Sequence, residues 1–241
     1  LASHLTGKGR MEEPEKIVEI LDRFFETSKP LSGKKVLITA GPTYEKIDPV
    51  RFIGNYSSGK MGFALAEACA EVGAEVSLKT NHSSIDRIDV ESAEEMYRAV
   101  LSEYDRSDIA IMCAAVADYA PETVSDVKLK RTGEDRILRL RPNPDIAAEL
   151  GRRKRPGQCL VGFALETNDE EMNARLKMEK KNLDFIVLNS LRDAGAGFQC
   201  DTNKVTVIGK QGDPVEIPCK PKIAVAADIV DIIGRYVLED R

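Results

Sequence analysis

The chain has 241 residues, a formal charge of −5, and 42% hydrophobic and 31% charged residues. This composition is typical of one globular domain, or one domain with a subdomain, and disfavours global disorder and a coiled coil. A mildly acidic chain lacks the basic footprint of a general nucleic-acid binder, and no apolar run approaches the ~20 residues of a membrane span. We therefore expect a cytoplasmic protein that binds neither nucleic acid nor membrane.

The cysteine and histidine residues argue against three further kinds of site: a disulfide framework, a catalytic triad and a histidine-rich metal site. The five cysteines are scattered without a CxxC pair, which favours reduced thiols over a disulfide framework. Neither His4 nor His82 stands beside a nucleophile or a ligand cluster, which disfavours a Ser-His-Asp triad and a histidine-rich metal site. The chain begins with Leu and has no signal-peptide segment, so we interpret it as a fragment or a processed chain.

Strand and helix patterns alternate along the first half of the chain. Helical spacing of apolar residues follows Pro14 in a leader segment over 12–29. This alternation predicts an α/β fold with a mostly parallel sheet, and right-handed crossovers make it a Rossmann-like three-layer sandwich. The expected strands are 36–39, 76–78, 88–90 and 109–113, and the expected helices are 59–73 and 93–104.

The second half adds a flap and a hairpin to this pattern. Charged and apolar residues alternate over Val127–Leu140, with Gly133 near the turn, which is typical of an exposed hairpin or flap. The end of the chain predicts a late antiparallel hairpin around 209–212 and a closing helix over 222–238. The remaining expected strands are 160–164, 185–188, 204–208 and 215–217, and the remaining helices are 143–150 and 169–181.

The connection over 40–58 is unusually long for a strand-to-helix loop, and such loops often carry function. Its last residues, Ser57–Lys60, open a helix whose N–H groups favour a phosphate or carboxylate. Gly54 and the glycine–lysine pair that follows nearly match a P-loop, but Met61 replaces the required Ser or Thr, and the strand ends far upstream. Helix–sheet packing is an equally good reading of Gly59 and Gly62.

Small residues follow the strand at 109–113, where a ligand can approach the backbone. Asp118 in this segment is suited to hold an amino group or a metal-bound phosphate, or simply to cap a helix. Cys113 has no adjacent histidine, which favours a buried structural cysteine over a nucleophile. The turn over 143–146 is suited to cap a helix or to contact a ligand.

Several lysines are candidates for an anion site. Lys177 and Lys181 share one helix face, and Lys128 and Lys130 alternate with apolar residues on the flap. Surface lysines are common, so the residue pattern alone favours a solvated surface over an anion site, and for the flap lysines an edge that discourages aggregation. An anion site at either pair stays open as the alternative.

Several long motifs lie along the chain. They are Ala40–Thr43, Asp48–Gly62, Ala114–Tyr119, Lys128–Lys130, Asn143–Ile146, Val161–Thr167 and Lys181–Asp184. Together and in this order, they give the chain a resemblance to phosphopantothenate–cysteine ligases over about residues 34–238. A shorter stretch, Gly7–Pro14, resembles the tail of the flavin-binding decarboxylase domain that precedes the ligase in bacterial bifunctional proteins. The resemblance implies a leader over 1–33 and a nucleotide-dependent ligase domain over 34–241.

The resemblance also implies a reaction. Bacterial members use CTP, with Mg²⁺ expected on the triphosphate, to join L-cysteine to 4'-phosphopantothenate. The carboxylate attacks the α-phosphate to give an acyl-cytidylate and pyrophosphate, and the cysteine amine then displaces CMP. Such chemistry needs positioning and charge neutralisation rather than a protein nucleophile. The resemblance further implies a homodimer, with the flap approaching the partner, and a parent protein with an N-terminal flavin decarboxylase domain.

Site residues follow from the same motifs. Lys128 is expected to reach the triphosphate, Asn55 to hold the activated acyl group, and Arg51 and Ala115 to shape the acyl site. Gly41 and Asn55, with the helix start at Ser57, Ser58, Gly59 and Lys60, are expected to bind the acyl substrate and its phosphate. The cytidine nucleotide is expected at Met112, Cys113, Ala114, Asp118, Lys128, Asn143, Pro144, Asp145, Ile146, Phe163, Lys177 and Lys181.

The sequence departs from the family pattern at two places, and two other functions compete with this interpretation. The loop Lys79–Asp86 is shorter than in most bacterial members, and Asn189-Ser190 stands where Asn-Asp is expected and receives no role. A nicotinamide-dependent reductase is disfavoured by the missing GxGxxG and by Pro42. A non-catalytic nucleotide-binding module is disfavoured by Asn55 and Lys128. The choice of CTP over ATP rests on the bacterial-type leader.

Overall fold

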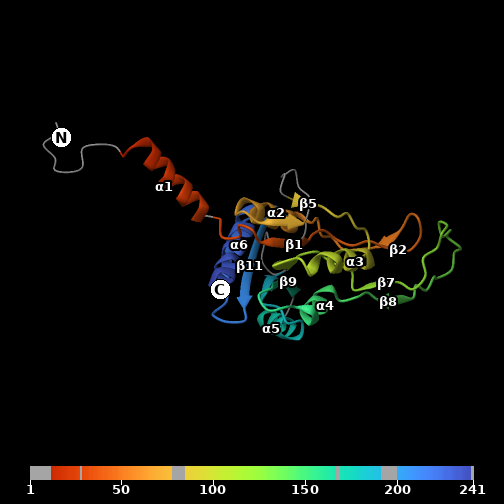
Figure 1. The fold of residues 1–241 in the computed structure, drawn as a ribbon. Helices are drawn as coiled ribbons and strands as arrows, with labels where there is room; N and C mark the ends of the chain where they lie inside the picture. Colours follow the sequence, from red (N-terminus) through yellow and green to blue (C-terminus); the bar gives the residue numbers. More distant parts are fainter. Residues whose placement is uncertain (1–11, 28, 78–84, 167–168, 191–199, 240–241) are drawn as a thin grey trace.

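The computed structural model describes residues 12–27, 29–77, 85–166, 169–190 and 200–239 (Figure 1). The main sheet contains β1 (Lys35–Thr39), β4 (Glu75–Ser77), β5 (Ile85–Asp86), β6 (Ile109–Met112), β9 (Cys159–Glu166), β10 (Phe185–Ser190), β11 (Thr202–Gly209) and β12 (Val215–Pro221). Their spatial order is β12-β11-β10-β9-β6-β1-β4-β5. The pairs between β5 and β10 are parallel, whereas β11 pairs antiparallel with both neighbours. The expected α/β fold with a late antiparallel hairpin is confirmed.

Helices cover both faces of this sheet. On one face α2 (Lys60–Glu71) and α6 (Lys222–Glu239) pack over the strands and fully bury Leu65 and Ile229. On the other face α3 (Ala93–Tyr104), α4 (Ile146–Arg153) and α5 (Glu170–Lys180) bury Leu150 and Leu160. Removal of these apolar side chains from water is the main force that holds the three layers together.

Local capping signals fix the starts of two helices. The Ser92 hydroxyl accepts a hydrogen bond from the Glu95 N–H at 3.2 Å, and the Glu95 carboxylate accepts one from the Ser92 N–H at 3.3 Å. This reciprocal pair is a capping box for α3. Hydrogen bonds from the N–H groups of Glu91 and Ser92 hold the pKa of Glu95 below its ordinary value. Asp145 begins α4 by accepting from the Ala148 N–H at 3.0 Å.

A short antiparallel pair at the base of the flap decides between the two interpretations of the segment over 127–140. β7 (Tyr119–Pro121) pairs with β8 (Leu140–Pro142), and residues 122–139 between them lie outside any strand. Of the two interpretations of Val127–Leu140, the structure favours the flap over the hairpin, because the antiparallel ladder forms only where the two chain segments meet the rest of the domain. We call residues 122–139 the flap, and Figure 1 shows it extending away from the sheet.

Two further elements differ from the prediction. The strand expected at 88–90 is formed by Ile85–Asp86 instead, where Ile85 is buried against the core. The connection over 40–58 contains a pair of two-residue strands, β2 (Glu45–Lys46) and β3 (Phe52–Ile53). Strands this short have too few residues to show an alternating pattern. Residues 79–84 of the shortened loop lie outside the described residues.

The order of the strands in the sheet indicates where a ligand is expected to bind. From β1 the chain proceeds outward to β4 and β5, and it then returns to the other side of β1 to form β6. In an open parallel sheet, ligands bind beyond the carboxyl ends of the strands at such a switch point. The residues that follow Thr39 and Met112 therefore occupy the expected position of a binding site.

The leader contains a helix, α1 (Pro14–Thr27), that stands off from the body (Figure 1). Val18 and Ile20 on this helix are about half exposed, whereas Leu31 is buried in the core beside α2 and α6. The domain boundary at 33/34 stays a prediction, and residues 7–11 of the decarboxylase-like tail lie outside the described residues. Within the described part of the chain, no helix combines the length and apolar character needed to cross a membrane.

Candidate functional site at the switch point

Hydrogen bonds join the segments that follow β1 and β6. The Ala115 N–H donates to the Gly41 carbonyl at 2.9 Å, and the Thr43 N–H donates to the Ala115 carbonyl at 3.3 Å. Pro42 and Ala115 form an isolated parallel bridge. The buried Thr43 hydroxyl accepts from the Ala117 N–H at 2.9 Å. These contacts give the two loops one fixed geometry at the switch point.

The end of the long connection is held by Asn55. Its Nδ2 donates to the Ala115 carbonyl at 2.8 Å, and its Oδ1 accepts from the Ser57 N–H at 3.0 Å. Gly59 has φ +74°, and a Cβ there would lie 3.1 Å from the backbone of Gly41, so this position requires glycine. The chain thus enters α2 without a side-chain cap. The first N–H groups of α2 are free to face an anion.

A cavity at the start of α2, which we call the α2 pocket, is lined by two lysine side chains. Lys60 forms an ion pair with Asp201 at 2.5 Å. Lys222 is buried, and its Nζ donates to the carbonyls of Cys200 and, at 3.2 Å, Thr202. The pocket is lined by Ser57, Ser58, Gly59, Lys60, Met61, Gly62, Cys113, Ala114, Ala115, Val116, Phe163, Ala164, Leu165, Asn189, Asn203 and Lys222.

A second cavity of about 370 Å³, which we call the α5 pocket, lies between the carboxyl ends of β6 and β9 and the helices α4 and α5. Lys181 pairs with Asp145 at 3.0 Å, and Lys177 pairs with Glu166 at 2.5 Å. The pocket is lined by Thr39, Met112, Ala114, Val116, Ala117, Asp118, Asn143, Pro144, Asp145, Ile146, Ala147, Gly162, Phe163, Lys177, Lys181, Leu183 and Ile186.

The two pockets meet along a shared wall. Ala114, Val116 and Phe163 line both cavities. A group bound in the α2 pocket can therefore approach a group bound in the α5 pocket across two small side chains and one ring. This arrangement suits a reaction between two substrates that enter from different sides.

The structure brings together most of the residues expected to bind the nucleotide. Ten of them line the α5 pocket, whereas Cys113 lines the α2 pocket and Lys128 lies outside both, on the flap. The ten are Met112, Ala114, Asp118, Asn143, Pro144, Asp145, Ile146, Phe163, Lys177 and Lys181.

The residues expected at the acyl site form a second group. Ser57, Ser58, Gly59, Lys60 and Ala115 line the α2 pocket. Gly41 and Asn55 line neither pocket, but both form hydrogen bonds with Ala115, which lines the α2 pocket. Arg51 lies outside both pockets, and its guanidinium donates to Asp48 and to the Leu129 carbonyl.

Burial sets the protonation of two groups in the α2 pocket. It raises the pKa of the Cys113 thiol to about 12, so this thiol stays protonated at neutral pH. It also lowers the pKa of the Lys222 ammonium. The hydrogen bond from Lys60 holds the pKa of Asp201 below its ordinary value. The protonated Cys113 thiol is therefore unsuited to act as a nucleophile in this pocket.

Three polar residues of the α2 pocket were missed by sequence reasoning. The Asn203 Nδ2 donates to the Asn189 Oδ1 at 2.9 Å, and both residues line the pocket together with Lys222. Asn189 directly follows an expected strand, and this position at a carboxyl end was an available signal. Asn203 and Lys222 come from β11 and α6, whose contribution to the site depends on the order of strands in the sheet.

Two carboxylates of the α5 pocket have the chemistry to hold a metal ion that is bound to a phosphorylated substrate. Among the residues that the structure describes, no group of three or more His, Cys, Asp or Glu could hold a metal ion. The α5 pocket offers the carboxylates of Asp118 and Asp145. Mg²⁺ commonly binds through one or two carboxylates together with substrate phosphates, and this donor set fits that pattern.

Comparisons with known sequences agree with these motifs. The family model described as "DNA/pantothenate metabolism flavoprotein C-terminal domain" matches residues 31–236. The chain is 50% identical to the coenzyme A biosynthesis bifunctional protein CoaBC of Bacillus subtilis (strain 168), over 97% of this chain and 60% of that protein. It is also 54% identical to a cysteine/cysteine sulfinic acid decarboxylase of an unknown prokaryotic organism, over 95% of this chain and 67% of that protein.

Solved structures show the same fold. The crystal structure of the C-terminal domain of a coenzyme A biosynthesis bifunctional protein CoaBC is 40% identical with a TM-score of 0.74, covering 89% of this chain and all of that one. A Cab2 variant in complex with phosphopantothenate-cysteine has a TM-score of 0.69 at 16% identity, covering 96% of both chains. At that lower identity the likeness concerns the fold alone.

Proposed function

Because this chain belongs to the family of DNA/pantothenate metabolism flavoprotein C-terminal domains, we propose that it is a phosphopantothenate–cysteine ligase of coenzyme A biosynthesis. The resemblance inferred from its motifs is borne out by this membership. The proposed reaction joins L-cysteine to 4'-phosphopantothenate at the expense of CTP. It gives 4'-phosphopantothenoylcysteine, CMP and pyrophosphate.

The observation that carries the proposal is the shared wall of the two pockets. The α5 pocket combines Lys177 and Lys181 with the polar turn at Asn143, a set suited to a nucleotide. The α2 pocket combines an uncapped helix start with Lys60 and Lys222, a set suited to a phosphorylated acid. Two anionic substrates held on opposite sides of Ala114 can react with each other without a protein nucleophile.

In the first proposed step, a carboxylate oxygen of 4'-phosphopantothenate attacks the α-phosphorus of CTP. The bond from that phosphorus to the β-phosphate bridging oxygen breaks, and pyrophosphate leaves with the electron pair. Negative charge accumulates on the triphosphate, and lysine ammonium groups stabilise it. We assign this role to Lys177, Lys181 and Lys128. Asp118 and Asp145 would hold the Mg²⁺ that arrives with the triphosphate, and this ion would neutralise further charge there.

In the second proposed step, the cysteine amine attacks the acyl carbon of the cytidylate. The bond from that carbon to the phosphate oxygen breaks, CMP leaves, and the nitrogen loses a proton to form the amide. Asn55 supports this step because one of its two amide hydrogens is committed to Ala115, which leaves the other to orient the acyl carbonyl.

We propose that the ligase works as a homodimer in which the flap contacts the partner. Large apolar side chains on and beside the flap are exposed, with Ile137 at 89% and Val127 at 71%. Exposed apolar patches of this kind often mark interaction surfaces. Sedimentation velocity of the purified chain tests the proposal: a dimer that Ile137→Lys converts to a monomer supports it, and a wild-type monomer contradicts it.

The proposed parent is a cytoplasmic, bifunctional protein with an N-terminal flavin decarboxylase domain. The chain spans 60% of the Bacillus subtilis relative, which is named a bifunctional protein. We assign the ligase half to this chain, and decarboxylation to the part of the parent that lies upstream.

Pyrophosphate release tests the function. Purified chain is incubated with Mg²⁺ and 4'-phosphopantothenate, with CTP or ATP, and with or without cysteine. We expect release with CTP that requires 4'-phosphopantothenate, and amide product once cysteine is added. Release with ATP alone would reverse the choice of nucleotide. Because one relative is named a decarboxylase, carbon dioxide release from cysteine and cysteine sulfinic acid is measured in parallel. Decarboxylation without pyrophosphate release would contradict the proposal.

A further inference from the structure

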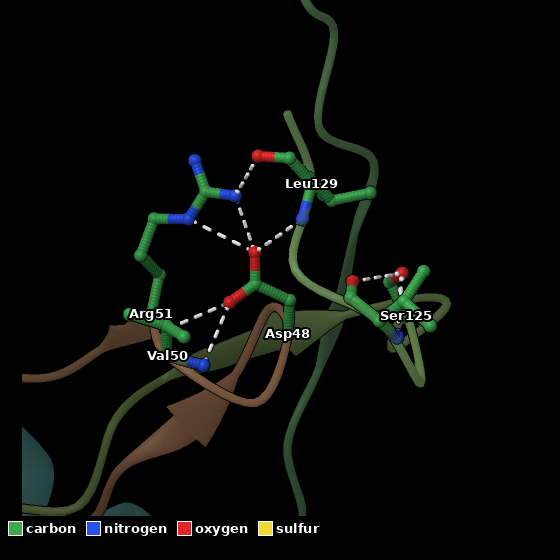
Figure 2. Close-up of polar contacts among 6 residues, drawn as sticks. Asp48, Val50, Arg51, Ser125 and Leu129 are labelled. Atoms are coloured by element: carbon green, nitrogen blue, oxygen red, sulfur yellow. Dashed lines mark hydrogen bonds and ion pairs between the residues drawn. The ribbon is translucent and has the colours of Figure 1, made fainter. Parts of the chain in front are cut away.

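A buried carboxylate outside both pockets joins the long loop over 40–58 to the flap. The side chain of Asp48 is completely buried. Its Oδ1 accepts from the N–H groups of Val50 at 2.8 Å and Arg51 at 2.9 Å. Its Oδ2 accepts from the Arg51 Nε at 2.9 Å, from the Arg51 Nη2, and from the Leu129 N–H at 3.1 Å. Figure 2 shows these bonds converging on one side chain.

Arg51 completes the connection from the other side. Its Nη2 also donates to the Leu129 carbonyl at 2.6 Å, so both backbone polar groups of Leu129 are held by the Asp48–Arg51 pair (Figure 2). The flap gains a further attachment where the Ser125 N–H donates to the Ile47 carbonyl at 3.0 Å. Flap residues 125–129 therefore lie against residues 47–51, far from them in sequence.

Lys128 immediately precedes the held residue. The N–H of Leu129 belongs to the peptide bond that joins it to Lys128, so a hydrogen bond to that N–H restrains the backbone from which the Lys128 side chain projects. Lys128 itself is exposed and lines neither pocket. An exposed lysine on a loop carries a large entropy cost when it must reach one position. A fixed backbone reduces that cost.

The charge of Asp48 is essential to this geometry. A carboxylate only accepts hydrogen bonds, and here every group directed at it is a donor. Hydrogen bonds from Arg51 hold the pKa of Asp48 well below its ordinary value, so the group is ionised at neutral pH. An asparagine of the same shape would place an NH₂ group against these donors.

We propose that Asp48 is a positioning residue for the first step of the reaction: through Arg51 and Leu129 it holds the flap so that Lys128 reaches the triphosphate. This inference rests on the proposed function and deepens it. Asp48 itself touches no substrate. The competing interpretation is that Asp48 only stabilises the fold, as a buried ion pair does in many proteins.

The test compares Asp48→Asn with a matched control, Asp184→Asn. Asp184 is also a buried carboxylate, which accepts from Lys154 at 2.8 Å and from the Leu160 N–H at 2.8 Å, but it lies at the amino ends of β9 and β10. Each variant is assayed for the first step, by pyrophosphate release, and for the second step, by amide formation from chemically prepared acyl-cytidylate.

We expect Asp48→Asn to lower kcat for pyrophosphate release by roughly 10-fold to 100-fold, the scale of a catalytic group displaced by about 1 Å. The second step stays at the wild-type rate, and Asp184→Asn leaves both steps unchanged. In a Lys128→Ala background, Asp48→Asn causes no further loss, because the group that it positions is absent. If Asp48→Asn fails to fold, Arg51→Lys at a half-exposed position is expected to reproduce the first-step defect, because lysine cannot hold both Asp48 and the Leu129 carbonyl as the guanidinium does.

Equal loss of both steps in the Asp48 variant, or losses that multiply with those of Lys128→Ala, would overturn the inference. A measurement made without substrate distinguishes a failure of this inference from a failure of the proposed function. Trypsin cleavage after Lys128 is expected to be faster in Asp48→Asn than in the wild type and in Asp184→Asn. If the wild type releases no pyrophosphate, the proposed function fails. If cleavage rates are equal, the connection between Asp48 and the flap fails.

Discussion

The side-chain amide of Asn55 donates a 2.8 Å hydrogen bond to the carbonyl oxygen of Ala115, although the residues are 60 positions apart. This bond joins the end of the long connection after β1 to the segment after β6, at the reversal of strand order. It also holds the side-chain amide of Asn55 against Ala115, which lines the α2 pocket. Asn55 thus has a structural partner and one remaining N–H that a substrate can use.

Asn55→Ala is expected to slow the cysteine-dependent step by roughly 10²-fold, the usual effect of losing one preorganised hydrogen-bond donor. Pyrophosphate release is expected to change much less, because the nucleotide contacts lie in the α5 pocket. Quenched-flow measurement of pyrophosphate and amide in the same reaction checks this difference. The control is Tyr56→Phe, since Tyr56 is adjacent and 79% exposed. Equal slowing of both steps would contradict the assignment of Asn55 to the acyl group.

Lys181→Gln is expected to raise the KM for CTP by roughly 10-fold or more, because a hydrogen bond to a charged group contributes about 1.5–3 kcal/mol. Lys181 lines the α5 pocket and pairs with Asp145, which the substitution leaves without its cation. Arg175→Gln is the matched control in α5, the helix that ends just before Lys181, where Arg175 pairs with Glu171 and does not line the pocket. An unchanged KM in the Lys181 variant would remove Lys181 from the nucleotide site.

Gly151→Ala is expected to destabilise the chain by about 1–3 kcal/mol or more, the range for overpacked sites. A Cβ at Gly151 would lie 1.9 Å from the Lys181 carbonyl oxygen, so α4 would move away from the turn that carries Lys181. Gly234→Ala is the control, since its Cβ would lie 3.4 Å from Pro30, an ordinary contact. That change is expected to be neutral or to stabilise by about 0.5–1 kcal/mol. Urea unfolding measures both, and equal effects would contradict the packing argument.

The stability of the chain should depend on pH through Asp48. Its pKa is lower in the folded chain than the ordinary value of 3.8, chiefly because of hydrogen bonds from Arg51. Such a group contributes stability that is fully present above the unfolded pKa and is lost as the pH falls through the folded pKa. We expect the free energy of unfolding to decrease below about pH 4, and to decrease less in Asp48→Asn. Urea unfolding between about pH 3 and pH 6 checks this. Parallel curves would contradict it.

Much of the fold could be predicted because its signals are local. Continuous apolar runs such as Val36–Thr39 identify buried parallel strands, and the capping signal at Ser92 marks a helix start. The pairing of β7 with β8 could not be predicted, since strands of three residues have no periodicity and their partner is chosen by tertiary contacts. The shift of β5 to Ile85–Asp86 has the same cause.

The site was predictable where its residues follow apolar strands, and not where they act through distant partners. Asp118 and Asn143 stand at positions where ligands bind in an open sheet. Asp48 lies within a quoted motif, but its partner Leu129 is 81 residues away, so no local pattern could indicate its role. Lys222 reaches the α2 pocket only because the final hairpin returns α6 to the sheet.

The most direct test of the account follows one carboxylate oxygen. 4'-Phosphopantothenate labelled with oxygen-18 in both carboxylate positions is incubated with the chain, Mg²⁺, CTP and cysteine, and the products are weighed by mass spectrometry. We predict one labelled oxygen in CMP, one in the amide product and none in pyrophosphate, because the carboxylate attacks the α-phosphorus. Label in inorganic phosphate with release of CDP, or CMP without label, would contradict the acyl-cytidylate route.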